Sequence, residues 1–280
     1  MCHPKIPIIS CGDPAGVGTE VLLKSWRRLR NTGQSFAVIH NADLLNKLSE
    51  FLKIDVPLRV IESPEQAASC FADALPVLNI RAGFSQVSFS SEAVISLMQA
   101  LAHKKLAPNT FAERLGTLAG YVDFIKSSLD EGIKQGLDNS NPLVTLPINK
   151  YVMSLGGFKY QGHTEYIKDY CGVKFVVMML ATRKSKLKVC PVKVHQSLAN
   201  SIKSLSVSDI VNTVRLVHQY LLSNGSPNPY IAVLGLNPHA GENGLMGDEE
   251  KQIITPAIQM LIGQGIRATQ ALPEIGRAHV

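Results

Sequence analysis

The chain lacks the features that mark secreted, membrane-spanning and disulfide-rich proteins. Its 280 residues include five cysteines, an odd number without paired CxxC spacing, which favours free thiols over a disulfide framework or a cysteine-rich zinc site. No apolar run reaches the length of about 18 residues that a membrane span needs. No basic segment followed by an apolar one opens the sequence, so we expect no signal peptide. The expected location is therefore the reducing cytoplasm.

Aromatic residues are also scarce, at 6% with one tryptophan, which leaves few side chains to stack on bases. The net charge is +6, but the basic residues are scattered, so we expect an ordinary solvated surface that attracts anionic metabolites and no nucleic-acid partner. A hydrophobic content of 45% and a charged content of 18% are typical of a soluble globular protein with a sizeable core. The length allows one large or two ordinary domains.

Short apolar runs alternate with helical patterns, which predicts an α/β fold with a largely parallel sheet. The expected strands are Ile6–Ser10, Phe36–His40, Leu58–Ile61, Val77–Ile80, Leu143–Ile148, Phe175–Leu180, Leu187–Val192 and Tyr230–Leu236. The expected helices are Val17–Arg30, Ala42–Leu52, Thr117–Gln135, Val207–Leu222 and Asp248–Gln264. A polar turn at Asp138–Pro142 is a plausible hinge, so we expect a first α/β domain over residues 1–140 and a second over residues 141–273.

The richest segment follows the apolar run Tyr230–Leu234 and reads GLNPHAGENGLMGDEE, from Gly235 to Glu250. A polar, glycine-rich loop at the carboxyl end of a strand is where open α/β sheets hold ligands. His239 in this loop could bind a divalent metal through one ring nitrogen, or it could be a hydrogen-bonded histidine in a flexible loop. The acidic residues that end the segment suit the start of a helix.

Two further turns could bind anions. Gly12–Gly18, GDPAGVG, allows close backbone approach to a ligand, but it fits neither a Rossmann fingerprint nor a P-loop, and a tight strand-to-helix turn is the structural alternative. Lys150, which ends TLPINK, could hold a phosphate or carboxylate as a point charge, or be a solvated lysine at a helix start.

Two histidine-containing segments complete the candidates. His163 and Thr164 in GHTE could orient a polar substrate, or they could be a surface pair. His195 closes the expected strand that begins near Leu187 and lies 44 residues before His239. These two histidines can share a metal only if their strand ends are adjacent, which sequence spacing does not show.

Taken together, GDPAGVGTE, TLPINK, GHTEYI, VVMMLA and GLNPHAGENGLMGDEE occur in an order that resembles the PdxA family of NAD-dependent 4-hydroxythreonine-4-phosphate dehydrogenases of vitamin B6 biosynthesis. The resemblance covers about Ile6 to Pro273. It implies the isocitrate/isopropylmalate dehydrogenase type of fold, with two α/β domains flanking a cleft, in a homodimer. That fold explains the missing Rossmann fingerprint.

The resemblance also implies a reaction and part of a site. The alcohol of a phosphorylated substrate is oxidised by hydride transfer to NAD, and the β-keto acid loses carbon dioxide to give 3-amino-2-oxopropyl phosphate. His195 and His239 match two of three histidines that hold a divalent metal (zinc, magnesium or cobalt), which would make the alcohol easier to deprotonate. His163 and Thr164 match the substrate-binding pair. The catalytic and cofactor-binding residues stay unassigned.

The C-terminal end departs from the family pattern. The family continues past Pro273 with the third metal histidine, in an HDQG motif, and with lysine, asparagine and arginine residues that hold the substrate. Glu274–Val280, EIGRAHV, has no family counterpart, and we interpret it as a non-native tail on a truncated fragment. We expect the 280-residue chain to expose apolar surface and to be inactive alone.

Two alternatives stay open. One is a related dehydrogenase of a four-carbon sugar-acid phosphate, such as threonate or erythronate 4-phosphate. The other is an inactive remnant that binds phosphorylated ligands without turnover.

Overall fold

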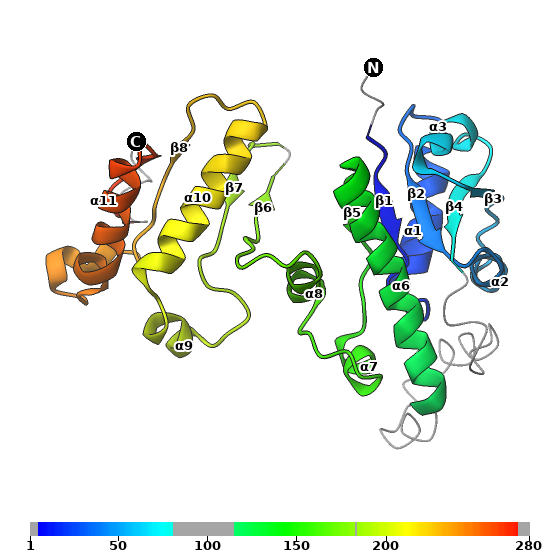
Figure 1. Ribbon diagram of the computed structural model, residues 1–280, viewed down its shortest axis with the longest axis horizontal. Coiled ribbons are helices and arrows are strands. Elements are labelled where there is room, and N and C mark those ends of the chain that lie inside the picture. Colours follow the sequence, from blue (N-terminus) through cyan, green and yellow to red (C-terminus); the bar gives the residue numbers. More distant parts are fainter. Residues whose placement is uncertain (1–4, 81–114, 183, 274–280) are drawn as a thin grey trace. The chain divides into compact units, whose positions relative to one another are not determined.

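The computed structural model describes residues 5–80, 115–182 and 184–273, which form two compact units (Figure 1). We call them unit 1, Met1–Cys171, and unit 2, Gly172–Val280. This division differs from the predicted boundary between residues 140 and 141, because the strand after the predicted hinge joins the sheet of unit 1.

The predicted non-native tail, residues 274–280, lies outside the described residues. In the described ranges, no helix combines the length and the apolar character needed to cross a membrane.

Unit 1 is built on a five-stranded sheet in the order β3-β4-β2-β1-β5, in which every neighbouring pair is parallel. Its strands are β1 (Ile8–Ser10), β2 (Ala37–His40), β3 (Leu58–Ile61), β4 (Leu75–Asn79) and β5 (Leu143–Thr145). β1 lies between β2 and β5, so Ile9 faces Val38 on one side and Val144 on the other. Parallel neighbours require crossover connections, and helices supply them.

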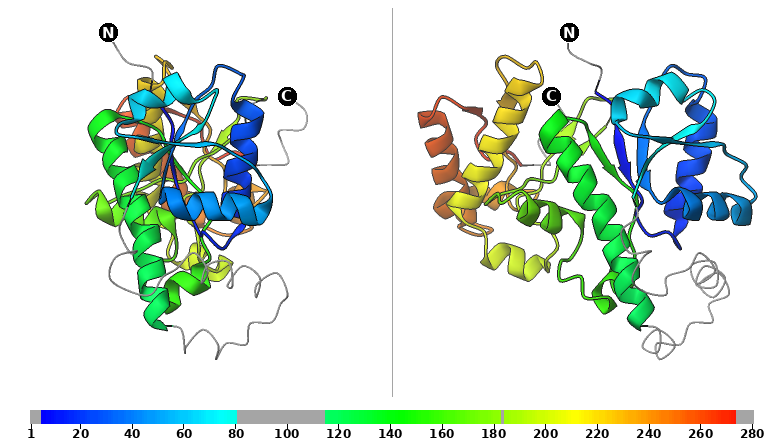
Figure 2. Two further views of the ribbon diagram at one scale, coloured as in Figure 1. Left: turned by 90° about the vertical axis from the view of Figure 1, so that its right-hand side faces the viewer. Right: turned by 45° about the vertical axis from the view of Figure 1, so that its right-hand side comes forward.

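Helices cover both faces of this sheet. α1 (Val17–Leu29) lies on one side and α6 (Leu115–Asn139) on the other (Figure 2). The other helical segments in the described residues of unit 1 are α2 (Ala42–Leu52), η1 (Pro64–Gln66), α3 (Ala67–Cys70), α7 (Lys150–Leu155) and α8 (His163–Tyr170). Because both faces are covered, the strands can be apolar throughout, as parallel strands usually are.

Alternate strand residues point to opposite faces and so enter different apolar clusters. Ile9, Val38 and Val77 pack with α1, including the buried Trp26. Their strand neighbours on the other face belong to a separate cluster: Ile8, Ala37, Ile39 and Leu78. Because side chains alternate between the two faces along each strand, one sheet contributes to two separate apolar cores.

Within residues 172–182 and 184–273, unit 2 has one apolar cluster and short strands. Its core lies between α10 (Val207–Ser223) and α11 (Thr255–Gly263), where Val214, Ile258 and Leu261 are buried. Its other elements are β6 (Leu180–Ala181), β7 (Lys188–Val189), α9 (Leu198–Lys203), β8 (Tyr230–Ile231), η2 (Ala240–Gly244), the π-helical η3 (Glu250–Ile254) and β9 (Arg267–Ala268). β6 pairs with β7 in antiparallel fashion, and β8 pairs with β9 in parallel fashion.

The α/β fold with a parallel sheet is confirmed, and so are the positions of the predicted helices. The predicted strands of unit 2 are wrong in length, because each of β6, β7 and β8 is paired over two residues only. Three short helices, α7, α8 and α9, are absent from the predicted helix ranges, since six to eight residues give too little periodicity, although a helix start at Lys150 was one of the two interpretations of that residue. The cysteines in the described ranges are free thiols, as expected: Cys11, Cys70, Cys171 and Cys190.

Candidate functional site

The carboxyl ends of β1 and β5 form the place in unit 1 where a ligand site is expected. From β1 the chain proceeds to β2 on one side, and it returns after β4 to add β5 on the other side. In open parallel sheets, ligands bind outside the carboxyl ends of the strands at such a reversal of order. The segments that leave β1 and β5 at this edge are the GDPAGVG turn and the TLPINK segment.

The GDPAGVG turn packs directly against the end of β5. Gly12 has φ of +62°, and a Cβ atom there would lie 2.7 Å from Leu146 Cβ and 2.8 Å from the Pro147 carbonyl oxygen. The backbone N–H of Asp13 donates to that same carbonyl at 2.9 Å. Glycine is therefore required both for the left-handed conformation and for the close approach.

Asp13 closes this turn with a buried carboxylate that sequence reasoning did not single out. It accepts hydrogen bonds from the Ala15 N–H at 2.9 Å and from the Tyr121 hydroxyl. Burial raises the pKa of Asp13, while hydrogen bonds from Tyr121 and from backbone groups that include Asn149 oppose the shift. Because Asp13 takes the Ala15 N–H with its side chain and the Gly16 N–H with its carbonyl, the turn is better explained as a structural strand-to-helix turn than as a phosphate loop.

The residues after β5 bring Lys150 close to the GHTE segment. Asn149 caps α7 by accepting from the N–H groups of Tyr151 and Val152, which fixes Lys150 as the first residue of the helix. His163 begins α8, and Thr164 follows it in the first turn. Burial lowers the pKa of His163, and the positive charge of Lys150 lowers it further. Unit 1 thus gathers Lys150, His163 and Thr164 in one region.

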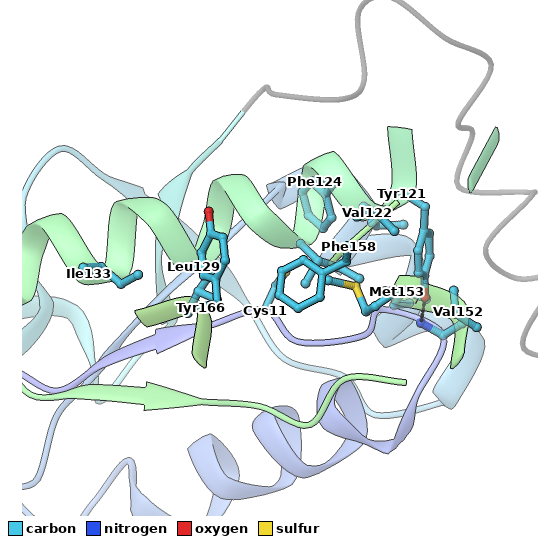
Figure 3. Close-up of a cluster of buried hydrophobic side chains, with 14 residues drawn as sticks. Cys11, Tyr121, Val122, Phe124, Leu129, Ile133, Val152, Met153, Phe158 and Tyr166 are labelled. Carbon is cyan, nitrogen blue, oxygen red and sulfur yellow. Dashed lines mark hydrogen bonds between the residues drawn. The ribbon is translucent and has the colours of Figure 1, made fainter. Parts of the chain in front are cut away.

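α8 is anchored by Tyr166, which packs with Phe158 of the segment between α7 and α8 (Figure 3). Tyr166 is buried, and its hydroxyl donates to the Asp130 carboxylate of α6. Its ring lies 5.3 Å from that of Phe158 and 5.1 Å from that of Tyr160, measured between centroids. The position of His163 at the start of α8 therefore depends on a buried anchor one turn later.

His239 lies in unit 2, in an exposed loop after β8 with unusual backbone conformation. The non-glycine residues Ala240, Glu242 and Asn243 have φ of 49°, 44° and 58°. His239 Nδ1 lies 2.9 Å from Glu242 Oε1. Left-handed conformations in non-glycine residues are costly and cluster at functional sites, so the loop is a site candidate on its backbone alone.

The buried carboxylate of Glu250 packs against the backbone of the loop that contains His239. Its Oε1 accepts the Leu236 N–H at 2.8 Å, while Oε2 is buried without a hydrogen-bond partner. A Cβ atom on Gly241 would lie 2.6 Å from Oε2, which explains the glycine at that position. From the sequence we assigned the acidic residues at the end of this segment to the start of a helix only, so the contact between Glu250 and the loop was not predicted.

His195 also lies in unit 2, exposed and in a left-handed conformation with φ of 57°, between β7 and α9. The residues that the structure describes contain no group of three or more His, Cys, Asp or Glu side chains that could hold a metal. A third ligand to accompany His195 and His239 is thus not found among them.

Comparison with known proteins identifies the family. The chain matches the family described as pyridoxal phosphate biosynthetic protein PdxA over residues 33–274. It is 33% identical over 272 residues to a 4-hydroxythreonine-4-phosphate dehydrogenase of Caulobacter vibrioides, covering 95% of this chain and 72% of the relative. To the protein of the same name from Erythrobacter litoralis it is 33% identical over 276 residues, covering 98% of this chain and 74% of the relative.

Solved structures agree with this assignment. The fold is similar to that of a 4-hydroxythreonine-4-phosphate dehydrogenase from Klebsiella pneumoniae, with a TM-score of 0.75 and 27% identity over 96% of this chain and 75% of that chain. A terephthalate 1,2-cis-dihydrodiol dehydrogenase from Burkholderia xenovorans, at 17% identity and a TM-score of 0.57, shares the fold alone. The predicted isocitrate/isopropylmalate dehydrogenase type of fold is confirmed. On sequence and structure alike, this chain belongs to the PdxA family.

Proposed function

We propose that this protein is a 4-hydroxythreonine-4-phosphate dehydrogenase of pyridoxal phosphate biosynthesis. The observation that carries the proposal is the family match over residues 33–274, together with relatives of that name that align with nearly the whole chain. Eight relatives matched by sequence, those two included, bear this one name, so the sugar-acid phosphate alternative gains no support.

The reaction that we propose has two stages. NAD accepts a hydride from the carbinol carbon of 4-phosphohydroxythreonine while the hydroxyl proton is lost, which gives a ketone β to the carboxylate. The carboxylate then leaves as carbon dioxide, and protonation of the carbon gives 3-amino-2-oxopropyl phosphate. His163 and Thr164, which are adjacent at the start of α8, are the proposed contacts to the substrate.

For His195 and His239 we propose the role of ligands to a divalent metal, zinc, magnesium or cobalt. One observation supports His239: its Nδ1 lies 2.9 Å from Glu242 Oε1. In the tautomer that carries the ring proton on Nδ1, this contact is a hydrogen bond to the carboxylate and Nε2 is left to bind a metal. A bound divalent ion would act as a Lewis acid on the substrate oxygen. Catalytic sites of this kind usually have three protein ligands, so two histidines would need a further one.

The proposed function is tested by assaying the full-length gene product with 4-phosphohydroxythreonine and NAD, with and without a chelator. We expect NADH formation that the chelator abolishes and added metal restores. Activity that survives complete metal removal would contradict the roles of His195 and His239.

We also propose that the enzyme is a cytoplasmic homodimer, with a phosphorylated small molecule as substrate and neither nucleic acid nor membrane as partner. The family resemblance supports this proposal. Light scattering of the purified full-length protein measures the mass in solution, and a monomer at assay concentrations would contradict the dimer.

A further inference from the structure

Two helices of unit 1 begin side by side. Lys150 is the first residue of α7, and His163 is the first residue of α8. A Cβ atom on Gly162, the residue just before α8, would lie 3.7 Å from Lys150 Cε and 3.9 Å from Lys150 Nζ. The ammonium group of Lys150 therefore lies at the start of α8, although 12 residues lie between Lys150 and His163 in the chain.

In the described part of the chain, the Lys150 ammonium group has no paired counterion. Among the described residues, no hydrogen bond and no ion pair within 4.0 Å joins its ammonium group to another side chain. Glu165 Oε2 is the nearby carboxylate oxygen, 3.6 Å from the same Cβ position on Gly162, yet it forms no ion pair with Lys150. The lysine is exposed, so its ammonium group can reach a ligand that arrives from solvent.

The backbone around Lys150 is fixed by the buried turn after β1. Asn149 caps α7 with its side chain, and its backbone N–H contributes to the hydrogen bonding of the Asp13 carboxylate. A lysine that is only a solvated surface residue does not need a backbone that is fixed in this way. The field of Lys150 also acts on His163, whose pKa it lowers after the larger effect of burial.

We infer that Lys150 contacts an anionic group of the substrate, together with His163 and Thr164. The inference deepens the proposed function, on which it rests for the identity of the substrate. An ammonium group beside the N–H groups that open α8 attracts an oxyanion. 4-Phosphohydroxythreonine carries two, a phosphate and a carboxylate, and the chemistry of recognition is common to both.

The test compares Lys150→Gln with the matched control Lys168→Gln, which removes a lysine from the last turn of α8, at the opposite end from His163. Calorimetry measures binding of 4-phosphohydroxythreonine, of 4-hydroxythreonine without the phosphate, and of inorganic phosphate. We expect Lys150→Gln to weaken binding of 4-phosphohydroxythreonine about tenfold or more, the size of one lost hydrogen bond to a charged group. Lys168→Gln should bind as the unchanged protein does.

The ligand series identifies the oxyanion. If Lys150 contacts the phosphate, Lys150→Gln weakens binding of inorganic phosphate and leaves 4-hydroxythreonine unaffected. If Lys150 contacts the carboxylate, Lys150→Gln weakens binding of 4-hydroxythreonine and leaves binding of inorganic phosphate unaffected. Equal affinities of Lys150→Gln and the unchanged protein for all three ligands would overturn the inference.

A second measurement needs neither ligand nor activity. The imidazole of His163, assigned by its loss in His163→Gln, is titrated by proton NMR in the unchanged protein and in Lys150→Gln. Removing the ammonium charge should raise the pKa of His163, whereas Lys168→Gln should not. An unmoved titration in a folded Lys150→Gln variant would overturn the proximity on which the inference depends.

The two proposals fail in different ways. If Lys150→Gln weakens phosphate binding but the full-length enzyme does not oxidise 4-phosphohydroxythreonine, the anion site stands and the proposed function fails. If the enzyme turns over this substrate and Lys150→Gln leaves KM unchanged, the function stands and the role of Lys150 fails.

Discussion

β1 in unit 1 is paired on both edges, with β2 and with β5, and all three of its residues are buried. In unit 2, by contrast, β6 and β7 pair with each other over two residues, and Leu180 and Val189 are 58% and 44% exposed. Both sets of segments are apolar in sequence. The comparison teaches that an apolar run identifies a segment able to form a strand, whereas neighbouring strands and covering helices decide whether it is buried.

The same contrast extends to the polar groups. Unit 1 buries several titratable side chains: Cys11, Asp13, His40 and Tyr121. The histidines of interest in unit 2, His195 and His239, are exposed in loops. Substitutions matched between the units test whether burial is the physical difference.

A pair of glycine substitutions should give the largest effect. Gly12→Ala in unit 1 combines a left-handed backbone with overlap against Leu146 and Pro147, and we expect a loss of about 3 to 4 kcal/mol in unfolding free energy. Gly225→Ala in unit 2 also has a left-handed backbone, with φ of 83°, but meets no atom within 4 Å, so about 1 to 2 kcal/mol should be lost. Hydrogen exchange in each unit measures the two losses, and equal values would contradict the role of close packing at Gly12.

The buried histidine of unit 1 should make stability fall in acid. Burial lowers the pKa of His40 from 6.5 to about 4. Below pH 6.5 His40 becomes protonated in the unfolded chain, whereas in the folded chain it stays neutral down to about pH 4. The free energy of unfolding therefore has its full value above pH 6.5 and decreases as the pH falls. The loss over this window should be about 3 kcal/mol.

Hydrogen exchange of β2 amides as a function of pH measures this effect. His40→Phe keeps a ring against Phe124, whose centroid lies 5.4 Å away, and should remove the slope. An unchanged slope in that variant would assign the acid sensitivity to another group.

Two valines on strands provide the next comparison. Val38 on β2 is fully buried, and Val38→Ala should cost about 2 kcal/mol of unfolding free energy through lost transfer energy and a small cavity. Val189 on β7 is 44% exposed, and Val189→Ala should change stability by about 0.5 kcal/mol or less. Denaturant titration of both variants provides the measurement. A loss at Val189 as large as that at Val38 would show that β7 is covered in solution.

Helix caps should give the smallest difference between the units. Asn41 caps α2 in unit 1, and Ser206 caps α10 in unit 2 within a capping box. Ser206→Ala should cost about 1 kcal/mol, because this cap acts locally. Asn41→Ala should cost about 2 kcal/mol, because it also removes the hydrogen bond from Asn41 Nδ2 to the Ile80 carbonyl, at 3.3 Å. Hydrogen exchange in the first turns of the two helices measures both costs, and equal costs would mean that the bond to Ile80 contributes nothing.

Much of unit 1 could be predicted from the sequence. The strands β1 to β4 and the helices α1, α2 and α6 were predicted to within a few residues, because their apolar periodicity agrees with their final burial. The stripe Val122, Ile125, Leu129 and Ile133 on α6 is buried throughout. The short helices after β5 could not be predicted, since their starts depend on single caps such as Asn149.

The site residues divide in a similar way. The sequence by itself determined the family, the motifs and the residue types that suit them: imidazoles, a lysine and glycines whose order along the chain is distinctive. Only the tertiary structure decided that Lys150 lies beside His163, that Asp13 fastens the turn after β1, and that Glu250 supports the loop of His239. The reason is physical. Local sequence fixes backbone preference over a few residues, whereas a contact across many residues forms only when packed strands and helices bring its two ends together.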